Sequence, residues 1–305
     1  MAEGILVLGA GELGLAVIEA LVKHAKRNNT KISVLMRQST LDSAAPEKIR
    51  ATEHFKKQGV HLDAGDVTQA SVSELAAIFA KYDTVVSCTG MGLPSGTQGK
   101  ITDAVLEGKV RRYFPWQFGM DYDVIGEGSS QDLFDEQLLV RKKLRAQSQT
   151  EWVIVSTGLF MSFLFEPAFG VVDIENKTVR ALGSWDNSIT LTTATDIGRV
   201  TADVILDPRD VKNQVVYTAG DTVTYEKLAE SLDDCFKTPF KRELWDLPIL
   251  RKQMEEDPNT MVKYRDTFAQ GRGVSWPLSQ TVNAARGIQL TDIQSYLKEL
   301  VVKLG

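Results

Sequence analysis

Three glycines near the N-terminus have a spacing that suits pyrophosphate binding. Gly9, Gly11 and Gly14 form the pattern G-x-G-x-x-G, with Glu12 and Leu13 inside it. Between a strand and a helix, such glycines permit a tight turn, close approach of a phosphate to the backbone, and close helix–strand packing. The start of the helix then offers N–H groups and the positive end of its dipole. The pattern predicts a cofactor-binding turn, although a glycine-rich turn without a ligand is the alternative.

The residue after the second predicted strand indicates which dinucleotide binds. Arg37 follows the apolar run Val34–Met36, where NAD-binding proteins usually carry Asp or Glu for the ribose 2′-hydroxyl. A guanidinium can instead pair with a 2′-phosphate, and Thr40 adds a hydroxyl group. The sequence therefore predicts NADP(H) as the cofactor, unless Arg37 is only a solvated charge at a strand end.

Polar and small residues follow the next three predicted strands as well. Because parallel strands end at one edge of a sheet, we expect these residues beside the same cofactor. They are Asp66 near the adenine, Ser87, Thr89 and Gly90 after the fourth strand, and Gln117 after the fifth, and we expect the aromatic Phe118 next to Gln117 at the cofactor as well.

Alternating strands and helices have to hold these residues in place. Apolar runs predict buried strands at 4–8, 31–36, 60–62, 84–88, 112–114 and 152–156, with helical patterns between them. This alternation predicts right-handed βαβ units and a parallel sheet covered on both faces. The predicted fold class is α/β, a Rossmann-type doubly wound parallel sheet with a smaller, mostly helical C-terminal substrate lobe.

The pattern becomes less regular beyond the sixth predicted strand, which suggests a second lobe. We predict an NADP(H)-binding domain at 1–157, with 190–222 returning to it. Residues 158–189 and 223–305 form the predicted substrate-binding lobe.

Composition narrows the function classes. The chain of 305 residues is 43% hydrophobic and carries a formal net charge of −5, which argues against a nucleic-acid partner. No apolar stretch is long enough for a membrane span. Two cysteines and three scattered histidines suggest neither a disulfide scaffold nor a metal site. We expect a cytoplasmic protein, a monomer or homodimer, acting on a small-molecule substrate.

The chain resembles the NmrA-like and isoflavone-reductase-like branch of the atypical short-chain dehydrogenases over nearly its whole length. Besides the glycine turn, the markers are Arg37 with Thr40, Gly65-Asp66, Ser87-Cys88-Thr89-Gly90, and the string RRYFPWQFGMD at 111–121. Plant members have an R-F-x-P-S-E-F-G-M-D-like string at this point, and the Trp116-Gln117 pair is similar to a fungal-type variant. The resemblance implies a reductase, often one that serves secondary metabolism.

The main departure from the family concerns a catalytic lysine. Family reductases carry it in F-x-x-K-x-x-V/I-R-R, and the matching residues here are Phe134, Gln137, Val140, Arg141 and Lys142. The lysine position is therefore Gln137. Lysine can place a cation near the nicotinamide and transfer a proton, whereas glutamine cannot titrate. Its amide can still hold a carbonyl or a bridging water.

Two further residues are catalytic candidates beside Gln137. Arg141 lies one helical turn beyond Gln137 on the same face, with a surface ion pair as the alternative. Tyr122 follows the fifth strand at the expected active-site edge, with loop packing as the alternative. The usual Tyr-x-x-x-Lys signature is absent.

Substrate contacts are expected from apolar and aromatic residues. The resemblance places one wall of the substrate pocket in the segment with Gly158, Phe160 and Met161, although core packing is the alternative. Trp276 is either an aromatic platform within a lid or a plug of the small lobe. Trp116 completes the predicted substrate set, which suits a hydrophobic or aromatic molecule.

Three functions fit these observations. The first is NADPH-dependent reduction of a carbonyl or enone compound. The second is a non-catalytic NADP(H)-sensing regulator that binds a protein partner, which the absent lysine favours. The third is a reductase-derived isomerase or cyclase that converts its substrate without net oxidation of NADPH.

Overall fold

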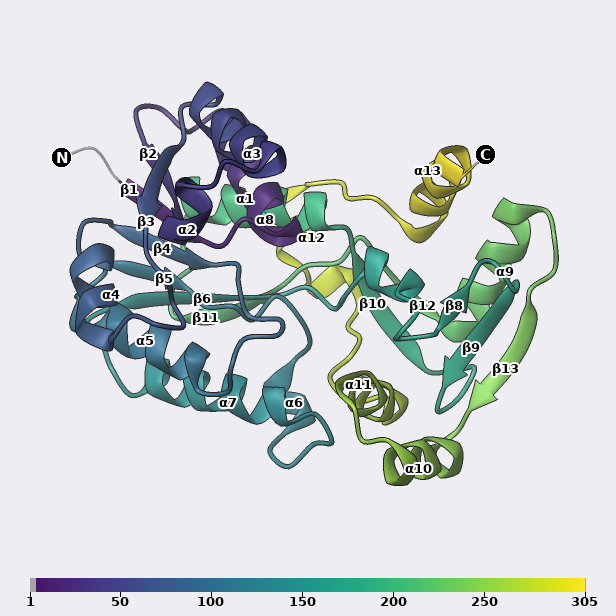
Figure 1. The fold of residues 1–305 in the computed structure, drawn as a ribbon. Coiled ribbons are helices and arrows are strands. Elements are labelled where there is room, and N and C mark those ends of the chain that lie inside the picture. The colour runs from purple at the N-terminus through teal and green to yellow at the C-terminus, as the bar shows by residue number, and fades with distance from the viewer. Residues whose placement is uncertain (1–3, 305) are drawn as a thin grey trace. The chain divides into compact units, whose positions relative to one another are not determined.

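The computed structural model describes residues 4–304 and divides into two compact units (Figure 1). The first unit comprises residues 4–117, 136–155 and 197–215, and the second comprises 118–135, 156–196 and 216–304. Contacts thus group 118–135 with the second unit, whereas the sequence analysis placed it in the cofactor domain. Which residues bind cofactor and which bind substrate stays a prediction.

A seven-stranded sheet forms the centre of the first unit, in the order β11-β6-β5-β4-β1-β2-β3. Neighbouring strands from β3 across to β6 run parallel. The order 3-2-1-4-5-6 is that of Rossmann-type folds, so this part of the prediction is confirmed. The strands are β1 (Gly4–Leu8), β2 (Lys31–Met36), β3 (His61–Ala64), β4 (Thr84–Ser87), β5 (Arg112–Phe114), β6 (Glu151–Ser156) and β11 (Gln214–Tyr217).

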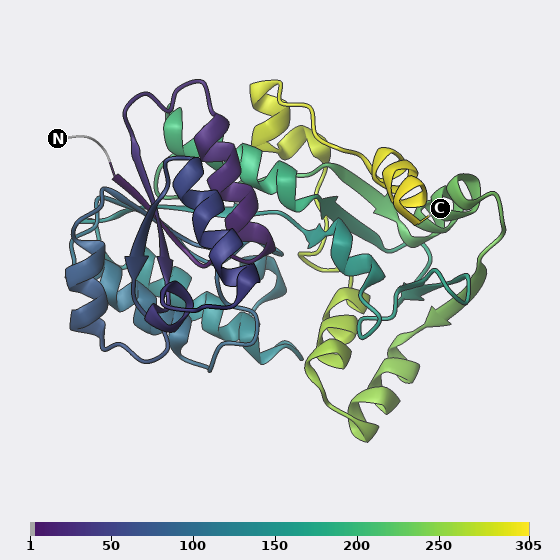
Figure 2. The ribbon, with the colours of Figure 1, turned by 45° about the horizontal axis from the view of Figure 1, so that its top comes forward.

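Helices cover both faces of this sheet (Figures 1 and 2). On one face lie α1 (Glu12–Lys23), α3 (Pro46–Lys57) and α8 (Ala194–Leu206), and on the other α4 (Val72–Phe79), α5 (Thr97–Glu107) and α7 (Asp132–Arg145); the short α2 (Gln38–Leu41) follows β2. Apolar strand residues such as Leu6 and Val85 pack with Phe79, Ile101 and Leu144 of the second group of helices. Coverage of both faces explains why the strands are continuously apolar.

The second unit contains more β-structure than the sequence predicted. It has two three-stranded sheets, β12-β10-β7 and β13-β9-β8, beside helices that contain more of its residues than the strands do. The strands are β7 (Leu159–Phe160), β8 (Val172–Asp173), β9 (Thr178–Leu182), β10 (Ser188–Thr192), β12 (Asp221–Thr224) and β13 (Lys241–Trp245). The helices are α6 (Tyr122–Ile125), η1 (Met161–Phe165), α9 (Tyr225–Phe236), α10 (Leu247–Glu256), α11 (Thr260–Ala269), η2 (Leu278–Gln280), α12 (Val282–Arg286) and α13 (Ile293–Leu304). Strands of two to five residues are too short for a periodic pattern to reveal.

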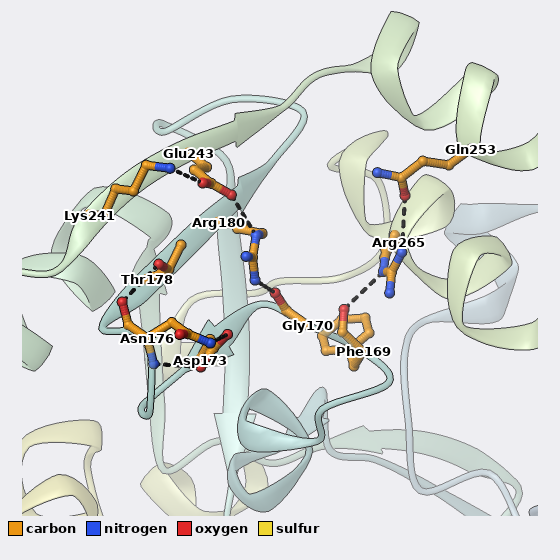
Figure 3. Close-up of polar contacts among 10 residues, drawn as sticks. All are labelled: Phe169, Gly170, Asp173, Asn176, Thr178, Arg180, Lys241, Glu243, Gln253 and Arg265. Atoms are coloured by element: carbon orange, nitrogen blue, oxygen red, sulfur yellow. Dashed lines mark hydrogen bonds and ion pairs between the residues drawn. The ribbon is translucent and has the colours of Figure 1, made fainter.

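Two arginines stabilise one edge of the second unit (Figure 3). Arg180 Nε donates to the carboxylate of Glu243 at 2.7 Å, and Arg265 Nε donates to the carbonyl oxygen of Phe169 at 2.9 Å. Both guanidinium groups also lie over the ring of Trp245, at 5.0 and 4.6 Å from its centroid. Cation–π contacts and hydrogen bonds to backbone carbonyls explain this charge cluster as a structural one.

Within residues 4–304, no helix is both long and apolar enough to cross a lipid bilayer.

Burial in the first unit predicts how replacing a side chain by alanine changes the stability of the protein. Phe79 is fully buried, so Phe79→Ala should lower the free energy of unfolding by about 3–5 kcal/mol. Leu139 is 48% exposed, and Leu139→Ala should change the free energy of unfolding by less than about 0.5 kcal/mol. Urea denaturation followed by circular dichroism measures both variants, and equal losses would contradict this description of the core.

Candidate functional site

The glycine turn joins β1 to α1 in the geometry that the sequence predicts. Gly9 has φ +97°, a conformation that L side chains rarely adopt. A Cβ on Gly14 would overlap the carbonyl oxygen of Gly9, so only glycine lets α1 lie this close to the turn. By contrast, no heavy atom lies within 4 Å of the position of a Cβ on Gly11. Because Gly11 also gives no side-chain cap to α1, the start of this helix can accept an anion from that open side.

A cavity of about 320 Å³ lies beside this turn in the first unit. Its walls come from the carboxyl ends of β1 and β2, from α3, and from the segments after β3 and β4. The lining residues are Gly9, Ala10, Leu15, Leu35, Met36, Arg37, Thr40, Lys48, Ala51, Phe55, Gly65, Asp66, Val67, Thr89 and Leu93. The lining combines apolar side chains with the charged groups of Arg37, Lys48 and Asp66, a composition that suits a nucleoside with a charged substituent.

The charged groups of the cavity are two cations and one carboxylate. Arg37 Nε lies 3.4 Å from an oxygen of Asp66, and Lys48 comes from the first turn of α3. Hydrogen bonds from Thr68 and the charge of Arg37 hold the pKa of Asp66 below its ordinary value. The sequence analysis found Arg37, Thr40 and Asp66 but missed Lys48. The polar sequence of α3 gives no signal that shows which of its lysines faces the end of β2.

Other predicted cofactor residues lie in different surroundings. Thr89 lines the cavity, whereas Ser87 is fully buried at the end of β4. The ring of Trp116 lies directly against Gly90, where a Cβ would overlap it. Phe118 is 8% exposed and belongs to the second unit.

Gln117 connects the end of β5 to helix α7. Its Nε2 donates to the backbone carbonyl of Gln137 at 2.9 Å, and its Oε1 accepts from Nε of Arg141 at 2.7 Å. The amide of Gln117 therefore holds α7 in place, and a direct contact with a cofactor stays a prediction.

Gln137 has a buried amide that lacks partners within the described residues. Its side chain is 1% exposed, and neither Oε1 nor Nε2 forms a hydrogen bond with any part of residues 4–304. An unsatisfied buried polar group costs roughly 1–3 kcal/mol of stability, and a hydrogen bond from a ligand or an ordered water to this amide would offset that cost. Arg141, one turn further along α7, is fully buried, so the alternative of a surface ion pair is wrong.

Tyr122 begins helix α6 in the second unit. Its ring packs on Phe134 at 4.8 Å between centroids, and its hydroxyl group lies where a Cβ of Gly119 would be. This arrangement agrees with the packing alternative for Tyr122, and a catalytic role stays a prediction.

The predicted substrate residues of the second unit differ in their access to a ligand. Met161 is fully buried, and Trp276 is 6% exposed with its Nε1 donating to the carbonyl oxygen of Thr218 at 3.2 Å. Trp276 thus fills the unit's interior, which favours the plug over the platform. Gly158 has φ +69° and lies against the backbone of β10, while Phe160 keeps part of its surface exposed.

Comparison with known proteins agrees with this architecture. Residues 1–297 match the NmrA-like family. An NmrA-like family domain-containing oxidoreductase of Gibberella moniliformis is 57% identical over 98% of this chain and 99% of its own length. Phenylcoumaran benzylic ether reductase 1 of Arabidopsis thaliana is 30% identical over 71% of this chain and 68% of its own length.

A solved structure shows the same fold at low sequence identity. The complex of leucoanthocyanidin reductase with NADPH from Vitis vinifera superimposes with a TM-score of 0.80 and 17% identity, covering 98% of this chain and 99% of the other. The chain thus shares the fold of isoflavone-reductase-like proteins over nearly its whole length.

Gly11 and Gly14 should respond in opposite ways to substitution by alanine. Gly11→Ala places a methyl group in open space, so it should change the stability by less than about 1 kcal/mol. It should weaken dinucleotide binding by at least about tenfold, or 1.4 kcal/mol, because the methyl group would meet an approaching phosphate. Gly14→Ala should instead destabilise the fold by about 1–3 kcal/mol. Thermal unfolding and a dinucleotide titration distinguish them, and unaltered binding by Gly11→Ala would show that no phosphate lies there.

Proposed function

The chain belongs to the NmrA-like family, in its isoflavone-reductase-like branch, and from this premise we propose that it is an NADPH-dependent reductase of a small hydrophobic or aromatic carbonyl or enone compound. The observation that carries the proposal is the cavity at the end of β2, where Arg37, Thr40 and Lys48 surround a space large enough for an adenosine. The proposed setting in secondary metabolism rests on the resemblance alone.

The residues present fit a dinucleotide with a 2′-phosphate. Its adenosine would fill the cavity between Leu35 and Val67, and the phosphate would meet the cations of Arg37 and Lys48. The pyrophosphate would lie at Gly11, where the structure leaves open space in front of α1. A dinucleotide with a 2′-hydroxyl would leave the two cations without an anionic partner from the ligand.

Helix α7 supplies the groups that would act on the substrate. Bound NADPH provides the hydride. The unpartnered Nε2 of Gln137 can donate a hydrogen bond to the oxygen on which negative charge develops. The buried charge of Arg141 lies one turn away and stabilises negative charge in the same region. Because Gln137 does not titrate, we propose water as the proton source.

The substrate would lie against aromatic and apolar side chains. In the first unit we propose a contact with Trp116, which is half-buried beside Gly90. A conjugated ring suits such a site because aromatic faces stack favourably.

One observation favours two other candidate functions. Glutamine at the family's lysine position also suits a regulator that binds NADP(H) without turnover, or an isomerase or cyclase that consumes none. A broad panel of carbonyl and enone compounds, assayed by NADPH absorbance and by product analysis, distinguishes the three. NADPH consumption supports the reductase, conversion without consumption supports the isomerase or cyclase, and binding without conversion supports the regulator.

Arg37 predicts the choice of cofactor. Arg37→Ala removes charge-assisted hydrogen bonds worth about 1.5–3 kcal/mol, so binding of NADPH should weaken roughly 10- to 100-fold. NADH lacks the 2′-phosphate, and its dissociation constant should change less than about threefold. Isothermal titration calorimetry measures both, with Arg111→Ala as a control that removes the same charge from an exposed site after α5. Equal weakening of both cofactors would refute a phosphate contact.

Substitutions of Gln137 test whether α7 contributes to catalysis. Gln137→Leu removes the amide donor, so kcat should fall by about 10²-fold with little change in NADPH binding, as for other oxyanion donors. Gln137→Lys should retain activity and introduce a pH dependence, since a buried lysine titrates at lowered pH. Leu139→Ala, on the exposed face of the same helix, serves as the control. Wild-type kcat in Gln137→Leu would exclude this residue from the chemistry.

A further inference from the structure

The ends of β2 and β3 lie side by side in the first unit. Met36 pairs with Ala64, and the next residue, Gly65, donates its N–H to the carbonyl oxygen of Met36 at 2.9 Å. Arg37 and Asp66 therefore leave the sheet from adjoining points. This explains why two residues separated in the sequence by α2 and α3 form an ion pair beside the cavity.

The carboxylate of Asp66 is oriented by Thr68. Its Oδ1 accepts hydrogen bonds from the backbone N–H of Thr68 at 2.8 Å and from its hydroxyl group at 2.6 Å. With Oδ1 engaged in this way, Oδ2 faces Nε of Arg37 at 3.4 Å. The N–H and the hydroxyl group of Thr68 thus engage one carboxylate oxygen and leave the other toward the guanidinium.

Lys100 fixes the segment that carries Thr68. From helix α5, its Nζ donates to the carbonyl oxygen of Thr68 at 2.9 Å and to that of Ala70 at 3.0 Å. Ala70 in turn donates its N–H to the carbonyl oxygen of Asp66 at 2.9 Å. Neither Lys100 nor Thr68 lines the cavity, so neither is placed to touch a ligand within it.

Arg37 is left with free donors that can reach the cavity. Its side chain is 60% exposed, and an unrestrained arginine would sample many rotamers. The contact with Asp66 involves Nε, while the two terminal amino groups form no hydrogen bond with residues 4–304. Those two groups form the planar fork that binds phosphate in a bidentate manner.

We propose that Thr68 and Lys100 are positioning residues for cofactor selectivity. Acting through Asp66, they hold the guanidinium of Arg37 with its terminal amino groups toward the cavity, and so favour a dinucleotide with a 2′-phosphate over one with a 2′-hydroxyl. This inference rests on the proposed function, because it deepens the recognition of NADPH. Its physical basis is pre-organisation, since an arginine already oriented loses less conformational freedom on binding.

The test compares NADPH and NADH with matched variants. Thr68→Val keeps the shape of the side chain and removes the hydroxyl group, Thr68→Ser restores it, and Lys100→Met removes the ammonium. We expect Thr68→Val and Lys100→Met to weaken NADPH binding about 5- to 20-fold and to leave NADH within about twofold, with Thr68→Ser close to wild type. Lys81→Met removes a charge from an exposed turn of the same unit and should change neither.

A double-variant cycle tests whether the effect passes through Asp66. Thr68→Val in an Asp66→Asn background should have no further effect on NADPH binding, because both changes act on one carboxylate. Equal weakening of NADPH and NADH in Thr68→Val and Lys100→Met would overturn the inference and assign these residues a merely structural role. Unchanged selectivity in every variant would overturn it as well, while leaving the reductase proposal intact. Wild-type protein that binds neither dinucleotide would overturn both.

Discussion

The parallel pairing of β1 with β2 and β4 is the constraint on which the rest of the site depends. Leu8, the last residue of β1, pairs with Leu35 on one side and with Ser87 on the other. The glycine turn, Arg37 and Thr89 therefore emerge at one edge of the sheet, although the sequence separates them widely. A shift of register by one residue would move each strand side chain to the opposite face of the sheet and disrupt its packing against the helices there. The cavity is thus as fixed as the core beneath it.

Burial of polar groups distinguishes the cavity of the first unit from helix α7. Around the cavity, Arg37, Lys48 and Asp66 remain partly or largely exposed, so water shares in their solvation and screens their charges. On α7, Gln137 and Arg141 are buried, and their electrostatic effects act at a lower effective dielectric constant. The groups proposed for binding and those proposed for chemistry therefore lie in different physical settings, and the amide of Gln117 at the end of β5 contacts α7.

Local patterns in the sequence predicted those features of the site that are set by residues close together in the chain. The glycine turn and Arg37 could be found because each follows a strand directly, and a motif match placed Gln137 on α7. The positions of Lys48 beside the cavity and of Lys100 beside the carbonyl oxygen of Thr68 were missed, because residue type does not show which way a helical lysine points. For Met161 and Trp276, residue type alone could not separate a core position from a pocket wall. The short strands of the second unit gave no periodic signal.

A crystal structure of the protein with NADP⁺ would test the central claim most directly. We expect the adenosine in the cavity of the first unit, with the 2′-phosphate between Arg37 and Lys48 and the pyrophosphate against Gly11 at the start of α1. A dinucleotide bound elsewhere, or one whose 2′-phosphate points away from both cations, would contradict it.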